Sequence, residues 1–72
     1  MKMLPLPMAK VGENVVIKQI NGKDEVRQHL SELGFVVDSE VMVISQITGN
    51  LIVQVKDSRV ALDKSLAMRI MI

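Results

Sequence analysis

The sequence lacks cysteine, tryptophan and tyrosine, and Phe35 is its single aromatic residue. Without cysteine the chain can form no disulfide, no thiolate metal site and no thiol nucleophile. One aromatic ring cannot make the stacking surface that binds single-stranded nucleic acid, nor the aromatic-lined groove that binds proline-rich peptides. These absences exclude thiol chemistry and two common binding modes of small domains.

The chain also lacks an excess of either charge, because nine Lys and Arg stand against eight Asp and Glu, for a net charge of +1. Nucleic-acid binders normally carry a basic excess that neutralises phosphates, so we expect no nucleic-acid partner. No apolar run approaches the roughly 18 residues of a membrane-spanning helix. Pro5 and Pro7 interrupt the apolar start, which is therefore a poor secretory signal. We expect a cytoplasmic protein without direct membrane insertion.

Residues suited to catalysis are scarce as well. His29 is the only histidine, no Gly-x-Ser-x-Gly segment is present, and the four scattered glycines match no phosphate-binding loop. The sequence therefore predicts no catalytic residue, no cofactor-binding residue and no enzyme activity.

Aliphatic side chains, by contrast, are abundant. Eighteen Val and Ile, seven Leu and six Met occur among the 72 residues. This length allows one small domain, which we expect to span residues 1–72. A core rich in β-branched side chains favours strands.

One segment, residues 23–33, has the periodicity of a helix. Its apolar residues on a single stripe are Val26, Leu30 and Leu33. Asn21 or Gly22 is expected to cap the start of this helix. Gly34 suits the left-handed position after a helix, which would place Phe35 where a Schellman-type end packs its ring on the helix.

The other segments have strand character. They are residues 15–20, 40–47, 51–56, 59–62 and 68–72. The first carries apolar residues on both faces, which predicts a bend or bulge near Lys18-Gln19. Thr48-Gly49-Asn50 and Asp57-Ser58 are turn signals, and Asp63 is expected to cap a helical turn over 64–67. The predicted fold is mainly β: a small SH3-like barrel of about five strands, with one α-helix inserted after the first strand and a short helical turn before the last.

Two groups of residues, spread from about Leu6 to Ile72, share a pattern with a known family. The first group is Gly12-Glu13, Val15, Ile17, Ile20, Gly22 and the run Arg27-Gln28-His29-Leu30-Ser31-Glu32-Leu33-Gly34-Phe35; the second is Val41, Val43, Gly49-Asn50, Val53, Val55, Arg59-Val60-Ala61-Leu62, Ala67 and Ile70. Together they resemble the FeoA family of small SH3-like proteins. That family usually has a glycine near Asp38, and Asp tolerates the left-handed conformation better than most residues. The C-terminal domain of DtxR-type metal-dependent repressors is related in fold.

The resemblance implies a non-enzymatic accessory protein of ferrous iron transport. Its partner would be the cytoplasmic part of a FeoB-like membrane GTPase transporter, whose iron uptake it would modulate, with no cofactor required. Two alternatives stay open: a small carrier of ferrous iron or another divalent transition metal, and a free-standing regulatory interaction domain of the metal-repressor type. A homo-oligomer is a further alternative, because a thin core gains stability from self-association.

The metal alternative rests on Glu25, His29 and Glu32, which follow i, i+4 and i+7 spacing on one helical stripe. Ferrous iron accepts imidazole and carboxylate ligands. At about 1.5 Å of rise per residue, however, the two glutamates lie about 10 Å apart, which is wide for a single ion. A solvated helix face explains the same residues.

Binding to a transporter partner would use the helix, the segment that follows it and one later arginine. The candidate contact residues are Arg27, Leu30, Phe35, Val36, Val37 and Arg59. Docking through such a surface depends on aliphatic and arginine side chains more than on rings. An arginine beside a GTPase invites an arginine-finger role, whereas an ion pair of Arg59 with Asp57 or Asp63 is the simpler alternative.

Overall fold

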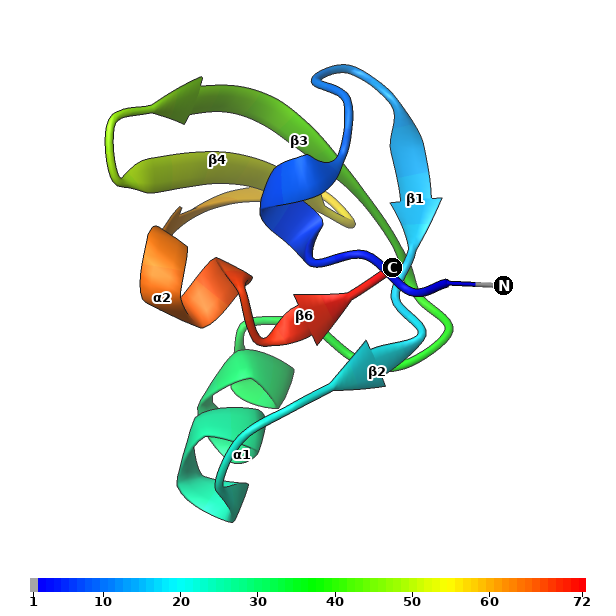
Figure 1. The fold of residues 1–72 in the computed structure, drawn as a ribbon, viewed down its shortest axis with the longest axis vertical. Coiled ribbons are helices and arrows are strands. Elements are labelled where there is room, and N and C mark those ends of the chain that lie inside the picture. Colours follow the sequence, from blue (N-terminus) through cyan, green and yellow to red (C-terminus); the bar gives the residue numbers. More distant parts are fainter. Residues whose placement is uncertain (1) are drawn as a thin grey trace.

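Short helical segments separate groups of one to three consecutive strands along the chain (Figure 1). The computed structural model describes residues 2–72. In chain order the elements are η1 (Leu6–Met8, a 3-10 helix), β1 (Asn14–Val16), β2 (Gln19–Ile20), α1 (Asp24–Glu32), β3 (Glu40–Ile47), β4 (Asn50–Val55), β5 (Ser58–Asp63), α2 (Lys64–Ala67) and β6 (Ile70–Met71). The expected mainly β domain is confirmed, with one helix after the early strands and a helical turn before the last.

Strand pairing forms two antiparallel sheets. One has the order β1-β3-β4-β5, and the other pairs β2 with β6. The chain passes from the first sheet to the second at Ile17 and Lys18, so the single strand expected over 15–20 is two strands with a break between them. Ile17 holds this break in place, because its side chain is buried and its N–H bonds to the carbonyl of Ser39 at 3.0 Å. Among residues 2–72, strand pairing gives these two separate sheets, and closure of the expected barrel stays a prediction.

The core lies between these two sheets and the helices. It consists of Leu6, Ile17, Leu30, Phe35, Val41, Val43, Leu51, Val53, Val55, Leu62, Ala67 and Ile70. Nearly all of these side chains are aliphatic, as the composition predicts, and they come from every part of the chain. Removing such surface from water is the main force that stabilises the domain.

Helix α1 begins one residue later than its expected caps allow. Lys23 is the N-cap and makes no side-chain capping bond, which corrects the prediction for Asn21 or Gly22. The N–H of Asn21 still bonds to the carbonyl of Arg69 at 2.8 Å, so that residue extends the β2 edge and is not available to the helix. Asp24 and Glu25 in the first turn compensate by placing negative charge at the positive end of the helix dipole.

The end of α1 is the predicted Schellman motif. Gly34 has φ +103°, its N–H bonds to the carbonyl of Ser31 at 3.0 Å, and the N–H of Phe35 bonds to that of Leu30 at 2.9 Å. Phe35 and Leu30 are both fully buried, so the ring turns into the core at this point.

The strands β3, β4 and β5 form two successive hairpins. Ile44 is the extra residue of a bulge, because the register of β3 on β4 shifts between Val43 and Ser45. The second turn consists of Lys56 and Asp57, one residue earlier than expected, and Lys56 takes φ +54°. The bulge explains why the apolar Ile44 interrupts the alternation of apolar and polar residues along β3.

Asp63 caps α2 as predicted. Its carboxylate accepts hydrogen bonds from the N–H of Leu66 at 2.8 Å and from the hydroxyl of Ser65 at 2.7 Å. These bonds, the one from Leu66 first, lower the pKa of the Asp63 carboxyl from its ordinary value.

Candidate partner-docking surface

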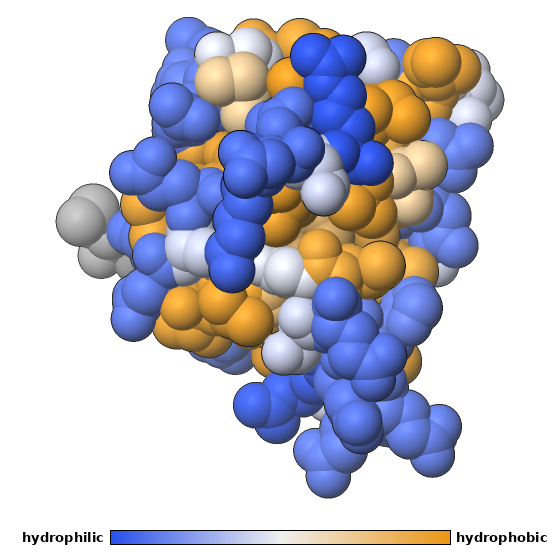
Figure 2. Space-filling view, turned by 180° about the vertical axis from the view of Figure 1, so that it is seen from behind, coloured by the Kyte–Doolittle hydropathy of each residue, from blue (hydrophilic) through white to orange (hydrophobic). Residues whose placement is uncertain are grey.

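A shallow hollow of about 180 Å³ lies where α1 meets β2 and the segment that follows the helix. Its lining residues are Ile20, Arg27, Ser31, Phe35, Val36 and Val37. In Figure 2 the side chains that protrude from the α1 end of the molecule are hydrophilic, and hydrophobic surface is exposed beside them. Four of the six predicted contact residues therefore meet at one place.

The apolar wall of this hollow is a tight turn that begins at Val36 and ends at Ser39. The N–H of Ser39 bonds to the carbonyl of Val36 at 3.2 Å and its hydroxyl bonds to the same oxygen at 2.7 Å. Asp38 takes φ +76°, the left-handed position that the sequence anticipates there.

This turn is also fastened to the first strand region. The N–H of Asp38 bonds to the carbonyl of Ile17 at 2.8 Å, and Ser39 accepts the bond from Ile17 described above. Val36 and Val37 keep exposures of 38% and 51% on this rigid backbone. Two aliphatic side chains are thus held in place facing solvent, which reduces the entropy that a partner must remove on binding.

The polar rim of the hollow is provided by α1. Arg27 is exposed and pairs with Asp24 at 3.8 Å, an exposed i, i+3 contact that contributes little. Its guanidinium can therefore turn to a partner carboxylate at small cost. Ser31 follows Arg27 by one helical turn, a spacing that would have identified it as a rim residue from the sequence.

Two predicted contact residues belong to the core. Leu30 and Phe35 are both 0% exposed. Phe35 forms the floor of the hollow, and Leu30 lies on the buried side of α1. We therefore correct their assignment from contact residues to residues that support the surface from within the core.

Arg59 lies away from this hollow. It is exposed on β5, opposite Gln54 of β4, and its Nε donates to Gln54 Oε1 at 3.1 Å. Neither ion pair suggested for it is formed in the part of the chain that the structure describes.

The candidate metal ligands do not form a site. Glu25, His29 and Glu32 are all exposed on α1. Among residues 2–72, no three His, Asp or Glu side chains come close enough together to hold a metal ion.

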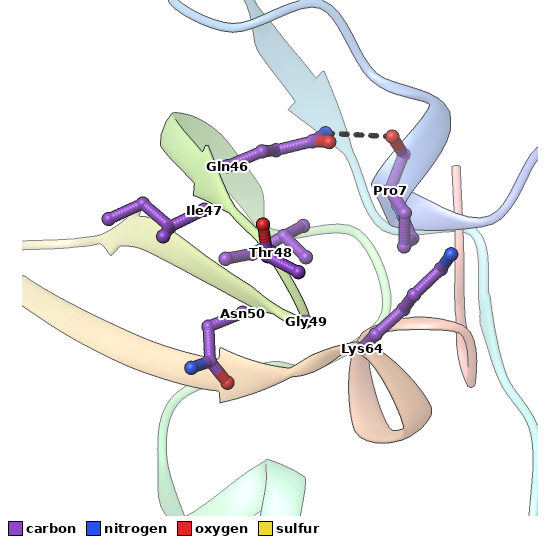
Figure 3. Close-up of a pocket in the computed structure, with 8 residues that line it drawn as sticks. Pro7, Gln46, Ile47, Thr48, Gly49, Asn50 and Lys64 are labelled. Carbon is purple, nitrogen blue, oxygen red and sulfur yellow. Dashed lines mark hydrogen bonds between the residues drawn. The ribbon is translucent and has the colours of Figure 1, made fainter.

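A second hollow, of about 320 Å³, was not predicted from the sequence (Figure 3). It lies between η1 and the turn of the β3–β4 hairpin, where Gln46 Nε2 donates to the carbonyl of Pro7 at 2.8 Å. Lys64 extends from α2 towards Pro7 and is the only charged residue of its lining. The turn signal at Thr48-Gly49 located the hairpin but not its packing on η1.

Over residues 2–72, neither α1 nor α2 has the length and apolar character of a membrane span.

Comparison with known proteins agrees with the fold and the composition. The FeoA domain family model matches residues 4–72. The chain is 37% identical over 70 residues to "Putative Fe(2+) transport protein A" of Methanocaldococcus jannaschii, covering 97% of this chain and 85% of that protein.

Solved structures show the same arrangement of elements. The crystal structure of an iron uptake regulatory protein (FeoA) superposes with a TM-score of 0.88 at 28% identity, covering 99% of this chain and 95% of that one. A manganese-dependent transcriptional repressor gives a TM-score of 0.88 at 18% identity, covering 97% of this chain and 40% of the repressor, which is a likeness of fold alone. The chain therefore belongs to the FeoA family, the non-catalytic accessory proteins of ferrous iron transport.

Proposed function

We propose that this chain binds the cytoplasmic part of a FeoB-like membrane GTPase transporter and thereby modulates ferrous iron uptake. The observation that carries the proposal is the hollow beside α1, where Val36 and Val37 face solvent on a rigid turn next to Arg27. An accessory protein without catalytic residues acts by binding, and this surface combines the aliphatic and arginine side chains that interfaces use.

The size of the surface indicates a reversible contact. Val36 and Val37 are already about half-buried, so completing their burial contributes about 1 kcal/mol each. An ion pair of Arg27 with a carboxylate of the transporter adds at most about 1 kcal/mol at such an exposed position. The hollow alone is therefore suited to an association that forms and dissociates readily, as regulation requires.

This proposal places the chain in the cytoplasm and gives it no cofactor. The alternative of a metal carrier has no observation in its favour, because Glu25, His29 and Glu32 do not converge. The alternative of a repressor-type regulatory domain is supported only by the likeness of fold between this chain and the repressor.

The proposal is tested by calorimetric titration of the chain into the soluble GTPase part of a FeoB-like transporter, and into the full transporter in membranes. We expect binding to at least one of them, weakened about tenfold by Val37→Asp, since a charge would have to be buried against an apolar surface. Val11→Asp is the matched control, because Val11 has a similar exposure of 56% but lies outside the hollow.

Binding to neither preparation would refute the proposed function. Equal weakening by Val37→Asp and Val11→Asp would refute the assignment of the hollow.

A further inference from the structure

Strand β5 lies at the end of the four-stranded sheet, so within residues 2–72 one of its two edges has no neighbouring strand. Two elements pack against β5: its partner strand β4 and, at its end, the helix α2. The residues Arg59, Ala61 and Asp63 are all exposed along this strand.

The two hairpins fix which groups point outward. A two-residue turn closes on a hydrogen-bonded pair, here Val55 with Ser58, and bonded pairs alternate with non-bonded pairs along an antiparallel ladder. Arg59, Ala61 and Asp63 therefore occupy non-bonded pairs with β4, and their N–H and C=O groups point away from it. The β3–β4 hairpin, which closes on Ile47 with Asn50, gives the same alternation for β4.

Most of these outward groups are unused within the chain. For residues 2–72, the N–H and C=O groups of Arg59 and Ala61 and the N–H of Asp63 form no backbone hydrogen bond outside the β4 ladder. The C=O of Asp63, the N-cap residue, accepts the first bond of α2. An edge of this kind is a template for another strand.

The charges on this edge are complementary to themselves. We propose that a second copy of this chain docks on β5, with the two β5 strands antiparallel and Ala61 of each copy at the two-fold axis. In this register Arg59 lies opposite Asp63 of the other copy, and Asp63 opposite its Arg59. All three outward residues then face outward residues. The Ala61 pair forms two backbone hydrogen bonds, and each Arg59–Asp63 pair forms one, from the N–H of Asp63 to the C=O of Arg59, so four form in total.

Neighbouring symmetric registers fit less well. A shift of the axis to Val60 places Asp63 opposite Asp57 of the other copy, and like charges directly opposed destabilise a sheet. A shift to Leu62 places Asp63 opposite Ala61 and moves Arg59 beyond the strand, opposite Ser65 at the start of α2. Only the axis at Ala61 pairs opposite charges, so the charged residues that repel unrelated strands select this partner and this register.

The side chains can make these contacts without giving up the fold. The bonds from Leu66 and Ser65 both go to Oδ1 of Asp63, which leaves Oδ2 for an arginine of the second copy. Arg59 at present donates to the neutral amide of Gln54, an exposed contact that a carboxylate can replace. Ala61 is small enough to meet its own copy across the axis.

Sedimentation of the intact chain at concentrations up to about 1 mM tests the inference. We expect a monomer–dimer equilibrium that shifts towards monomer as salt is raised. Ala61→Pro should abolish the dimer and leave the melting temperature nearly unchanged, because proline is tolerated where a strand N–H faces solvent. Arg59→Asp should weaken association by about tenfold or more, since two attractive pairs become repulsive. Lys18→Asp, the same change of charge beside β1 at the other end of the sheet, should have no effect.

Amide hydrogen exchange identifies the surface independently of the variants. The amides of Ala61 and Asp63 should become protected as the concentration rises, while the exchange of Val36 and Val37 stays constant. A monomer throughout the concentration range would overturn the inference. So would a dimer in which these two amides stay unprotected, or one that Arg59→Asp leaves unchanged.

Discussion

Gly34→Ala tests the link between the end of α1 and the core most sharply. Gly34 has φ +103°, which side chains rarely adopt, and a Cβ added there would lie 2.8 Å from Cγ1 of Val55. Val55 is only 2% exposed on β4, so its side chain cannot move into solvent to make room. The substitution therefore causes both backbone strain and an overlap inside the core.

The two contributions can be estimated separately. The left-handed backbone costs about 1 kcal/mol with alanine in place of glycine. Overpacking a well-filled core costs about 1–3 kcal/mol more. At about 0.05–0.15 kcal/mol per residue, a chain of 72 residues has a stability of about 4–11 kcal/mol. Gly34→Ala should thus remove a large fraction of it, about 2–4 kcal/mol.

Urea unfolding measures this loss, with Gly49→Ala as the control. Gly49 has φ +81° but no heavy atom within 4 Å of its added Cβ, so only the backbone cost of about 1 kcal/mol applies. In the double variant Gly34→Ala/Val55→Ala the overlap is relieved, and the two losses should fall short of additivity by about 1 kcal/mol. Equal losses for Gly34→Ala and Gly49→Ala would refute the reasoning.

Three further predictions concern stability. Asp38→Gly should stabilise the chain by up to about 1 kcal/mol in urea unfolding, because glycine adopts φ +76° without strain; a loss of stability would contradict the geometry of the turn. Leu30→Ala should cost about 2–5 kcal/mol, whereas Arg27→Ala should change stability by less than about 0.5 kcal/mol, and similar losses would mean that Leu30 is not in the core. For Asp63, the pKa in the folded state lies below its ordinary value of 3.8, so its stabilising effect is present above that pH and disappears as the pH falls through the folded pKa. The melting temperature of Asp63→Ala should therefore be lower than that of the wild type at neutral pH and approach it in acid, and a gap that is constant with pH would contradict the capping role.

Local structure was predictable from the sequence where one residue determines it. Gly34 followed by Phe35 indicated the Schellman end, and Asp63 before a short polar segment indicated the cap of α2. Both depend on backbone conformation and hydrogen bonds within a few residues. The same reasoning failed for the start of α1, because a long-range bond to Arg69 keeps Asn21 in the β2 ladder.

The docking surface was predictable only in part, because periodicity shows which residues share a face but not which face is covered. Arg27, Val36 and Val37 lie near one another as expected, whereas Leu30, for which support of the fold and partner contact were both open, is in the core. Ile20 joins the hollow through the pairing of β2 with β6, a contact distant in sequence. Tertiary pairing of this kind leaves no local signal.

Amide chemical-shift mapping of the chain, titrated with the soluble GTPase part of a FeoB-like transporter, tests the central claim most directly. We predict that the largest changes fall on Arg27, Ser31, Val36 and Val37, around the hollow beside α1. Changes confined to the β3–β4 hairpin and η1, with the hollow unaffected, would contradict the account.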